Sequence, residues 1–160
     1  YGHCANEPEG GMGALAASGT VSCALCEGTG GRLVHEAARL RVIHASEAGF
    51  PAFYRLIWRE HVREFSELSR DDRVLCMEAV TVIEQAMREL LAPTKINLAT
   101  LGNVVPHLHW HVISRFDWDS HFPSPVWAGP QRERAPEREA EVVARLPALE
   151  ARIIERLRSL

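Results

Sequence analysis

The stretch PHLHWHVI, residues 106–113, alternates imidazole and apolar side chains. Successive side chains of a β-strand point to opposite faces of a sheet, so the pattern predicts a strand with three histidines on one face and apolar residues in the core. Neighbouring histidines would lie about 6.5–7 Å apart along the backbone, close enough to bind one metal ion or one phosphate group. The polar face of an edge strand does not need three histidines in a row. The stretch therefore predicts a functional site formed by His107, His109 and His111.

Short apolar runs separated by turn residues predict further strands on both sides of one long helix. The runs cover residues 32–35, 38–44, 53–58, 96–101 and 108–116. Between them, residues 69–91 carry apolar side chains three or four positions apart, with Ser69 as a capping residue and Pro93 as a stop. This order of elements predicts an α+β domain with an antiparallel sheet of about five strands.

The two ends of the chain differ in character from this central part. Residues 1–11 show no hydrophobic periodicity, and we expect a flexible leader at 1–21 ahead of a domain at 22–128. Residues 129–160 are expected to be a proline-rich connection followed by a charged, amphipathic C-terminal helix, broken or kinked at Pro147. The apolar stripe of that helix would lie on the body of the domain or on a partner subunit.

Composition excludes several classes of function. The 160 residues hold 18 basic and 21 acidic side chains, for a formal net charge of -3. Without a basic excess there is no electrostatic case for binding a nucleic acid duplex or a membrane surface. Four cysteines are too few for a disulfide scaffold in a chain of this size, so we expect a reducing, cytoplasmic setting.

A row of neutral imidazoles suits two chemistries. In the first, three histidines hold a catalytic zinc ion with a bound water. In the second, one imidazole nitrogen attacks phosphorus and forms a covalent intermediate while its neighbours hold the phosphoryl oxygens. The histidine stretch alone does not distinguish them.

Cys23 and Cys26 form a CxxC pair, which is typical of half a zinc site or of a redox pair and also arises by chance. The glycine-rich residues 27–31 make a poor start for the helix that a redox pair requires. A zinc pair needs two more ligands from distant segments, and His61 and His107 are the candidates.

Residues 97–113, NLATLGNVVPHLHWHVI, resemble the signature of the histidine triad (HIT) family. The CxxC pair, the His61-Val62 segment and the helix from Ser69 agree with that resemblance, which extends over residues 22–127. It implies a HIT-like fold, a homodimer and a small nucleotide substrate. The implied activity is that of a nucleotide hydrolase or nucleotidyl transferase acting at the α-phosphate through a nucleotidyl-histidine, in a bacterial subfamily described as diadenosine tetraphosphate hydrolase-like. The alternative is a HIT module that binds a nucleotide or a partner without turnover.

The resemblance also implies roles for particular residues. His109 matches the family nucleophile, and His111 matches the residue that contacts phosphate oxygens and assists the leaving group. Contacts to ribose and phosphate fall to Asn97, Asn103, His107 and His111. A structural zinc ion would be held by Cys23, Cys26, His61 and His107.

The chain departs from the family pattern at three positions. Phe53 stands where a substrate-side histidine is common, Asn103 stands where many members have glutamine, and Ser114 replaces a common proline. These changes leave the nucleophile intact and bear on which nucleoside is recognised. Trp118 and Trp127, in the loop after the triad, are candidates for stacking on a nucleoside or for simple packing.

Overall fold

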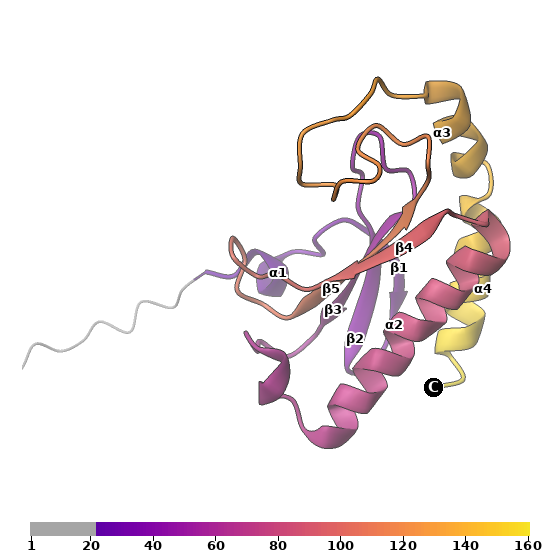
Figure 1. Ribbon diagram of the computed structural model, residues 1–160. Coiled ribbons are helices and arrows are strands. Elements are labelled where there is room, and N and C mark those ends of the chain that lie inside the picture. Colours follow the sequence, from indigo (N-terminus) through magenta and orange to yellow (C-terminus); the bar gives the residue numbers. More distant parts are fainter. Residues whose placement is uncertain (1–21) are drawn as a thin grey trace, which may run out of the picture.

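A computed structural model describes residues 22–160, and the predicted leader at 1–21 lies outside the described residues. Its centre is an antiparallel five-stranded sheet in the order β1-β2-β3-β5-β4, which confirms the predicted α+β class (Figure 1). The strands are β1 (Arg32–Glu36), β2 (Leu40–His44), β3 (Phe53–Trp58), β4 (Lys95–Ala99) and β5 (His109–Arg115). The short helix α1 (Ala24–Glu27) precedes the sheet, and a 3₁₀ turn, η1 (Phe65–Glu67), follows β3.

Strand β5 begins one residue later than the sequence pattern predicts, at His109. The preceding Leu108 bonds beyond the end of β3 instead: its N–H donates to the Val62 carbonyl at 2.7 Å, and its carbonyl accepts from the Trp58 N–H at 3.1 Å. The prediction of three histidines in one row on a strand is therefore wrong in one respect, because His107 precedes the strand.

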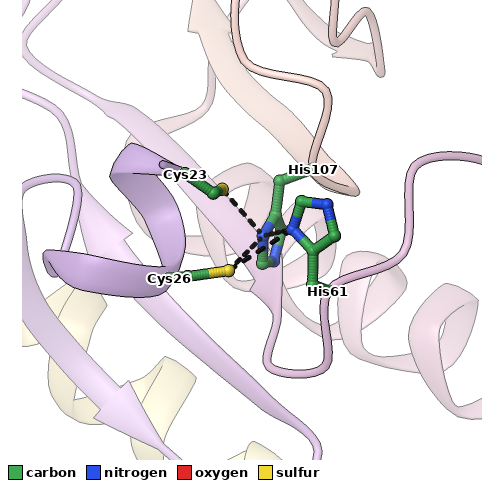
Figure 2. A group of neighbouring side chains, drawn as sticks. All are labelled: Cys23, Cys26, His61 and His107. Atoms are coloured by element: carbon green, nitrogen blue, oxygen red, sulfur yellow. Dashed lines mark hydrogen bonds between the residues drawn. The ribbon is translucent and has the colours of Figure 1, made fainter. Parts of the chain in front are cut away.

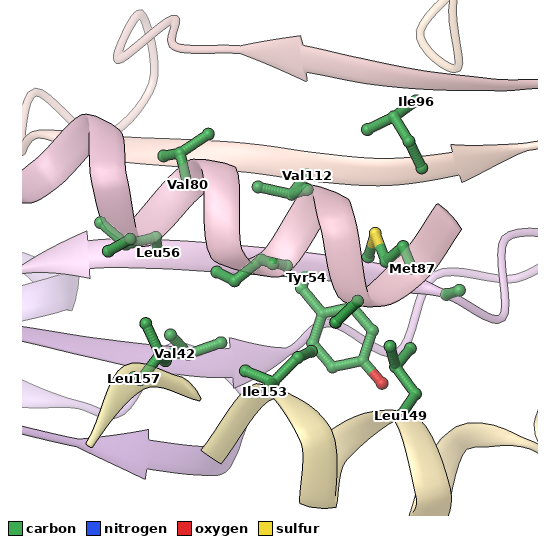
Figure 3. Packing of buried hydrophobic residues seen from close by; sticks show 14 of the residues in the cluster. Val42, Tyr54, Leu56, Val80, Met87, Ile96, Val112, Leu149, Ile153 and Leu157 are labelled. Carbon is green, nitrogen blue, oxygen red and sulfur yellow. The ribbon is translucent and has the colours of Figure 1, made fainter. Parts of the chain in front are cut away.

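Helix α2 (Arg70–Leu91) covers one face of the sheet. Ser69 caps its start by accepting the Asp72 N–H at 3.1 Å, and Ala92 ends it in a left-handed conformation (φ 47°) just before Pro93. The helix buries its apolar side against the strands (Figure 3). That stripe consists of Cys76, Ala79, Val80, Ile83, Ala86, Met87 and Leu91.

The C-terminal segment forms two helices, α3 (Pro136–Val143) and α4 (Leu146–Leu157), so the predicted helix is broken and not merely kinked. The break falls just ahead of Pro147, which lies in the first turn of α4 where a missing N–H costs nothing. Leu149 and Ile153 of α4 are fully buried beside α2 and β1 (Figures 1 and 3). The apolar stripe of this segment thus packs on the body of the same chain.

The two faces of the sheet carry different side chains. Trp110 and Val112 of β5 point into the core under the helices, whereas His109 and His111 point to the opposite side, which we call the open face. A smaller apolar cluster on the open face joins the CxxC segment to β2, β3 and β5. None of the helices described in residues 22–160 has the length and apolar content that crossing a membrane requires.

Candidate functional site

Four predicted metal ligands converge at one end of the open face. Cys23 and Cys26 come from the start of α1, and His61 and His107 come from loops distant in sequence (Figure 2). The His107 Nδ1 atom lies 3.4 Å from the Cys23 Sγ atom, 3.5 Å from the Cys26 Sγ atom and 3.3 Å from the His61 Nδ1 atom. The Cys26 Sγ atom lies 3.3 Å from the His61 Nδ1 atom. The four ligand atoms all lie within 4.8 Å of one another, so this cluster could bind a metal ion.

The spacing of these atoms fits a tetrahedral site. Zn–S bonds of about 2.3 Å and Zn–N bonds of about 2.0–2.1 Å would place neighbouring ligand atoms about 3.3–3.8 Å apart. The separations of the four atom pairs given above, 3.3–3.5 Å, fall within that range. Two thiols and two imidazoles are also the donor set that tetrahedral structural sites use.

The ring of His107 is oriented so that its lone pair faces the cluster. Its Nε2 atom lies 2.6 Å from the Trp58 carbonyl, which only accepts a hydrogen bond, so Nε2 carries the proton. In the neutral ring, Nδ1 then has the lone pair that can coordinate a metal ion. The residue is 1% exposed, and burial lowers its pKa, which favours the neutral ring that a metal requires. Contact of His107 with a substrate stays a prediction.

Contacts from strand β2 hold the CxxC turn against the sheet. Arg41 of β2 donates to the carbonyls of Leu25 at 2.5 Å, Gly28 at 3.0 Å and Thr29 at 3.2 Å. Gly30, at φ 81°, lets the chain pass so close that a β-carbon there would lie 2.7 Å from the Leu25 side chain. These contacts hold the turn that carries both thiols.

His109 has one ring nitrogen committed and one free. Its Nδ1 atom donates to the His107 carbonyl at 2.6 Å, because a carbonyl can only accept. The hydrogen on Nδ1 leaves the Nε2 lone pair available as a nucleophile. Thr100 donates to the His109 carbonyl at 2.8 Å and ties this residue to the end of β4. The backbone carbonyl of His107 thus sets the tautomer of His109.

His111 lies beside His109, with 4.9 Å between ring centroids. It is 6% exposed, and its Nδ1 atom has no hydrogen-bond partner among the described residues. Burial, with added repulsion from His109 and from Arg55, lowers the pKa of His111 to about 4. The ring is therefore neutral near pH 7, with an unpaired nitrogen to offer a ligand.

The two predicted asparagines lie apart. Asn97 of β4 accepts from the Arg115 guanidinium at 2.8 Å, on the same face as His111. Asn103 is exposed in the loop before the triad. Contact of either side chain with substrate stays a prediction.

The two loop tryptophans also separate. Trp118 stacks on Phe116 at 4.8 Å and contributes to packing, whereas the Trp127 ring lies 5.2 Å from His111 and is 54% exposed. Trp127 borders a groove of about 570 Å³ that runs along β4 past Asn97 and Ala99. Because Ala99 pairs directly with His111, this groove adjoins the histidines.

Two arginines of the site, Arg115 and Arg55, belong to no sequence motif and were not predicted from the sequence. Arg115 is 1% exposed and joins Asn97, the Asp119 carboxylate and the Ser124 carbonyl, which fixes the loop that carries Trp127. Arg55 of β3 lies directly opposite His111 in the register. The only available signal for Arg55 is a charged residue inside an otherwise apolar strand.

The HIT domain family matches residues 30–118, more than half of the chain. The protein therefore belongs to the HIT domain family. No curated protein matches the chain in sequence.

Solved structures agree with the fold. A histidine triad protein from Marinobacter aquaeolei is 28% identical, with a TM-score of 0.64 over 81% of this chain and 92% of that one. A histidine triad protein from Bradyrhizobium japonicum is 24% identical, with a TM-score of 0.64 over 79% of this chain and 92% of that one. A zinc-bound histidine triad family protein from Mycobacterium smegmatis is 23% identical, with a TM-score of 0.55 over 84% of this chain and 97% of that one.

Proposed function

We propose that the protein is a nucleotide hydrolase or nucleotidyl transferase that acts at the α-phosphate through a nucleotidyl intermediate on His109. The observation that carries the proposal is the 2.6 Å contact between the His109 Nδ1 atom and the His107 carbonyl, which in the neutral ring puts the lone pair on Nε2. Membership of the HIT domain family supports a nucleotide-directed function of this kind. The proposed substrates are dinucleoside polyphosphates, as in the diadenosine tetraphosphate hydrolase-like subfamily, or nucleoside phosphoramidates.

The reaction has two displacements. The His109 Nε2 lone pair forms a P–N bond to the α-phosphorus while the bond from phosphorus to the leaving group breaks, and the leaving group takes that electron pair. His111, neutral near pH 7, contacts the phosphoryl oxygens by hydrogen bonding. Water then attacks phosphorus, the P–N bond breaks, and a nucleoside monophosphate and one proton are released. In a transferase another hydroxyl or amine replaces the water.

We propose a structural zinc ion at Cys23, Cys26, His61 and His107. Zinc would cross-link α1 to the segment before β5 and so hold the His107 carbonyl that orients His109. A zinc ion coordinated by four protein ligands has no open position for a catalytic water, which favours the covalent mechanism over a three-histidine catalytic metal. Ligand thiols must stay reduced, in agreement with a cytoplasmic location.

The family resemblance further supports a homodimer. Sedimentation velocity at several protein concentrations tests it: we expect a mass of two chains, and a single chain at all concentrations would rule the dimer out.

Trapping the intermediate tests the function. Wild-type protein is mixed with adenosine 5′-phosphoramidate or diadenosine tetraphosphate, quenched in alkaline denaturant and weighed by mass spectrometry. We expect a mass increase of one AMP, which His109→Ala abolishes together with about 10³-fold or more of the turnover. His35→Ala is the matched control, because His35 lies on the distant strand β1. Tight AMP binding without adduct or turnover would instead establish the non-catalytic module.

A further inference from the structure

The strand next to the histidines carries a cation that faces the same side of the sheet. Arg55 is the direct register partner of His111 across the β3–β5 ladder, one strand spacing of about 4.7–4.9 Å away. Directly opposite side chains lie on the same face, so the guanidinium belongs to the open face. It is close enough to His111 to be one of the causes of that residue's lowered pKa.

The guanidinium of Arg55 is only partly paired. Its Nη2 atom contacts Glu47 at 3.1 Å, and its Nε atom is buried without a hydrogen-bond partner among the described residues. Glu47 is 47% exposed on the loop before β3, so water can solvate its carboxylate if the pair opens. A buried N–H donor without an acceptor is costly, and an anion on the open face would satisfy it.

Phe53 holds this arginine in place. The Arg55 guanidinium lies 5.5 Å from the centre of the Phe53 ring, and the same ring meets the His111 ring edge-on at 5.5 Å. The aromatic side chain therefore bridges the arginine and the histidine. Its apolar ring lowers the local dielectric, which strengthens the attraction of the cation for an anion.

We infer that Arg55 binds the phosphate group next to the one attacked by His109, so that the enzyme prefers phosphoanhydrides with an anionic leaving group. This inference rests on the proposed function. When the bond from the α-phosphorus to the bridging oxygen breaks, the bridging oxygen leaves with the electron pair and the leaving phosphate gains negative charge. A fixed guanidinium stabilises that developing charge and can form two parallel hydrogen bonds to phosphate. An amine leaving group requires a proton instead, which an arginine cannot supply because its guanidinium stays protonated.

A comparison of two substrates tests the inference. We expect Arg55→Met to lower kcat/KM for diadenosine tetraphosphate about 10- to 100-fold and kcat/KM for adenosine 5′-phosphoramidate less than about 3-fold. Arg55→Lys keeps the charge and should recover part of the loss. Arg152→Met, which removes an exposed pair with Glu89 on the helix side, is the matched control. Equal losses on both substrates, or no loss on either, would overturn the inference.

A binding measurement separates this inference from the proposed function. Calorimetry compares the binding of α,β-methylene-ADP and of AMP. The methylene analogue carries the second phosphate on a bridge that cannot be cleaved, and AMP lacks that phosphate. We expect Arg55→Met to weaken the methylene analogue about 10-fold or more and AMP little, whether or not the wild-type protein turns over any nucleotide.

The variant Glu47→Gln removes the competing carboxylate and should leave binding of the methylene analogue unchanged or tighter. If Glu47→Gln and Arg55→Met weaken the analogue equally, the pair only fixes the loop and the inference fails. Failure of adduct formation on wild-type protein, with the binding difference intact, would refute the proposed function alone.

Discussion

Replacement of Asp119 by asparagine tests the buried network that fixes the loop over the open face. Asp119 and Arg115 have side chains 2% and 1% exposed and form two hydrogen bonds, at 2.8 and 3.0 Å. The carboxylate also accepts three backbone N–H groups, from Phe116, His121 and Phe122, at 2.8–3.2 Å. Two donors converge on one carboxylate oxygen and three on the other. The negative charge is therefore bound on both sides.

The structure sets the magnitude of the loss. An asparagine keeps one oxygen, so its amide must face at least two donors, and it leaves the Arg115 cation buried without a counter-charge. Breaking a buried pair in this way costs about 3–5 kcal/mol of unfolding free energy. For a domain of this size that corresponds to a fall in Tm of roughly 6–20 °C.

Urea denaturation followed by circular dichroism measures the effect, with Asp117→Asn as the matched control. Asp117 is two residues away and exposed, so the same substitution there should change stability by less than about 0.5 kcal/mol. The pKa of Asp119 is lowered by Arg115 and by the backbone N–H donors against the opposing effect of burial. Its contribution to stability is therefore present above the unfolded pKa of about 3.9 and disappears as the pH falls through the lower folded value. Equal stabilities of the two variants would refute this account of the loop.

Three further predictions concern the metal, a histidine and the helix α4. Atomic absorption should find less metal in Cys26→Ser than in wild-type protein, and Cys26→Ser should unfold at a lower urea concentration. The control Cys76→Ser, on α2, should have the metal content of wild-type protein. Full metal content in Cys26→Ser would contradict the site. Folding lowers the pKa of His111 to about 4, so the contribution of its neutral ring to stability is complete above pH 6.5 and declines below it. In urea titrations between pH 7 and pH 5, the free energy of unfolding of wild-type protein should therefore fall by about 2 kcal/mol more than that of His111→Phe. Equal falls in the two proteins would contradict this. Leu149→Ala should cost about 2–5 kcal/mol and Leu160→Ala, at a 54% exposed residue, almost nothing; similar urea midpoints would show that α4 is not part of the core.

Local patterns were sufficient for most of the fold. Alternation in residues 106–113 and helical spacing in 69–91 report directly on which side chains leave water, so they predict β5 and α2 and the face on which His109 and His111 lie. Ser69 as the cap and Pro93 beyond the end of the helix act within a few residues, which is why both helix ends were predictable. The four metal ligands were also named from sequence, although only the HIT resemblance, not their spacing, joined them into one set.

The tertiary structure decided what depends on contacts between distant segments. His107 turns from the strand because the backbones of Leu108, Val62 and Trp58 pair beyond the end of β3. The C-terminal stripe packs on α2 of the same chain, since only the assembled core shows where an apolar surface remains uncovered.

The sequence alone thus determined the fold class and the location of a histidine site, because hydrophobic periodicity and a dense histidine motif are local properties; the HIT resemblance added His109 as the nucleophile candidate. The structure alone placed Arg55 beside His111, Trp127 against the same ring, and the Asp119 carboxylate under Arg115. Such placements depend on strand register and on the path of a loop. Both follow from the packing of the whole chain, so neither can be inferred from a short stretch of sequence.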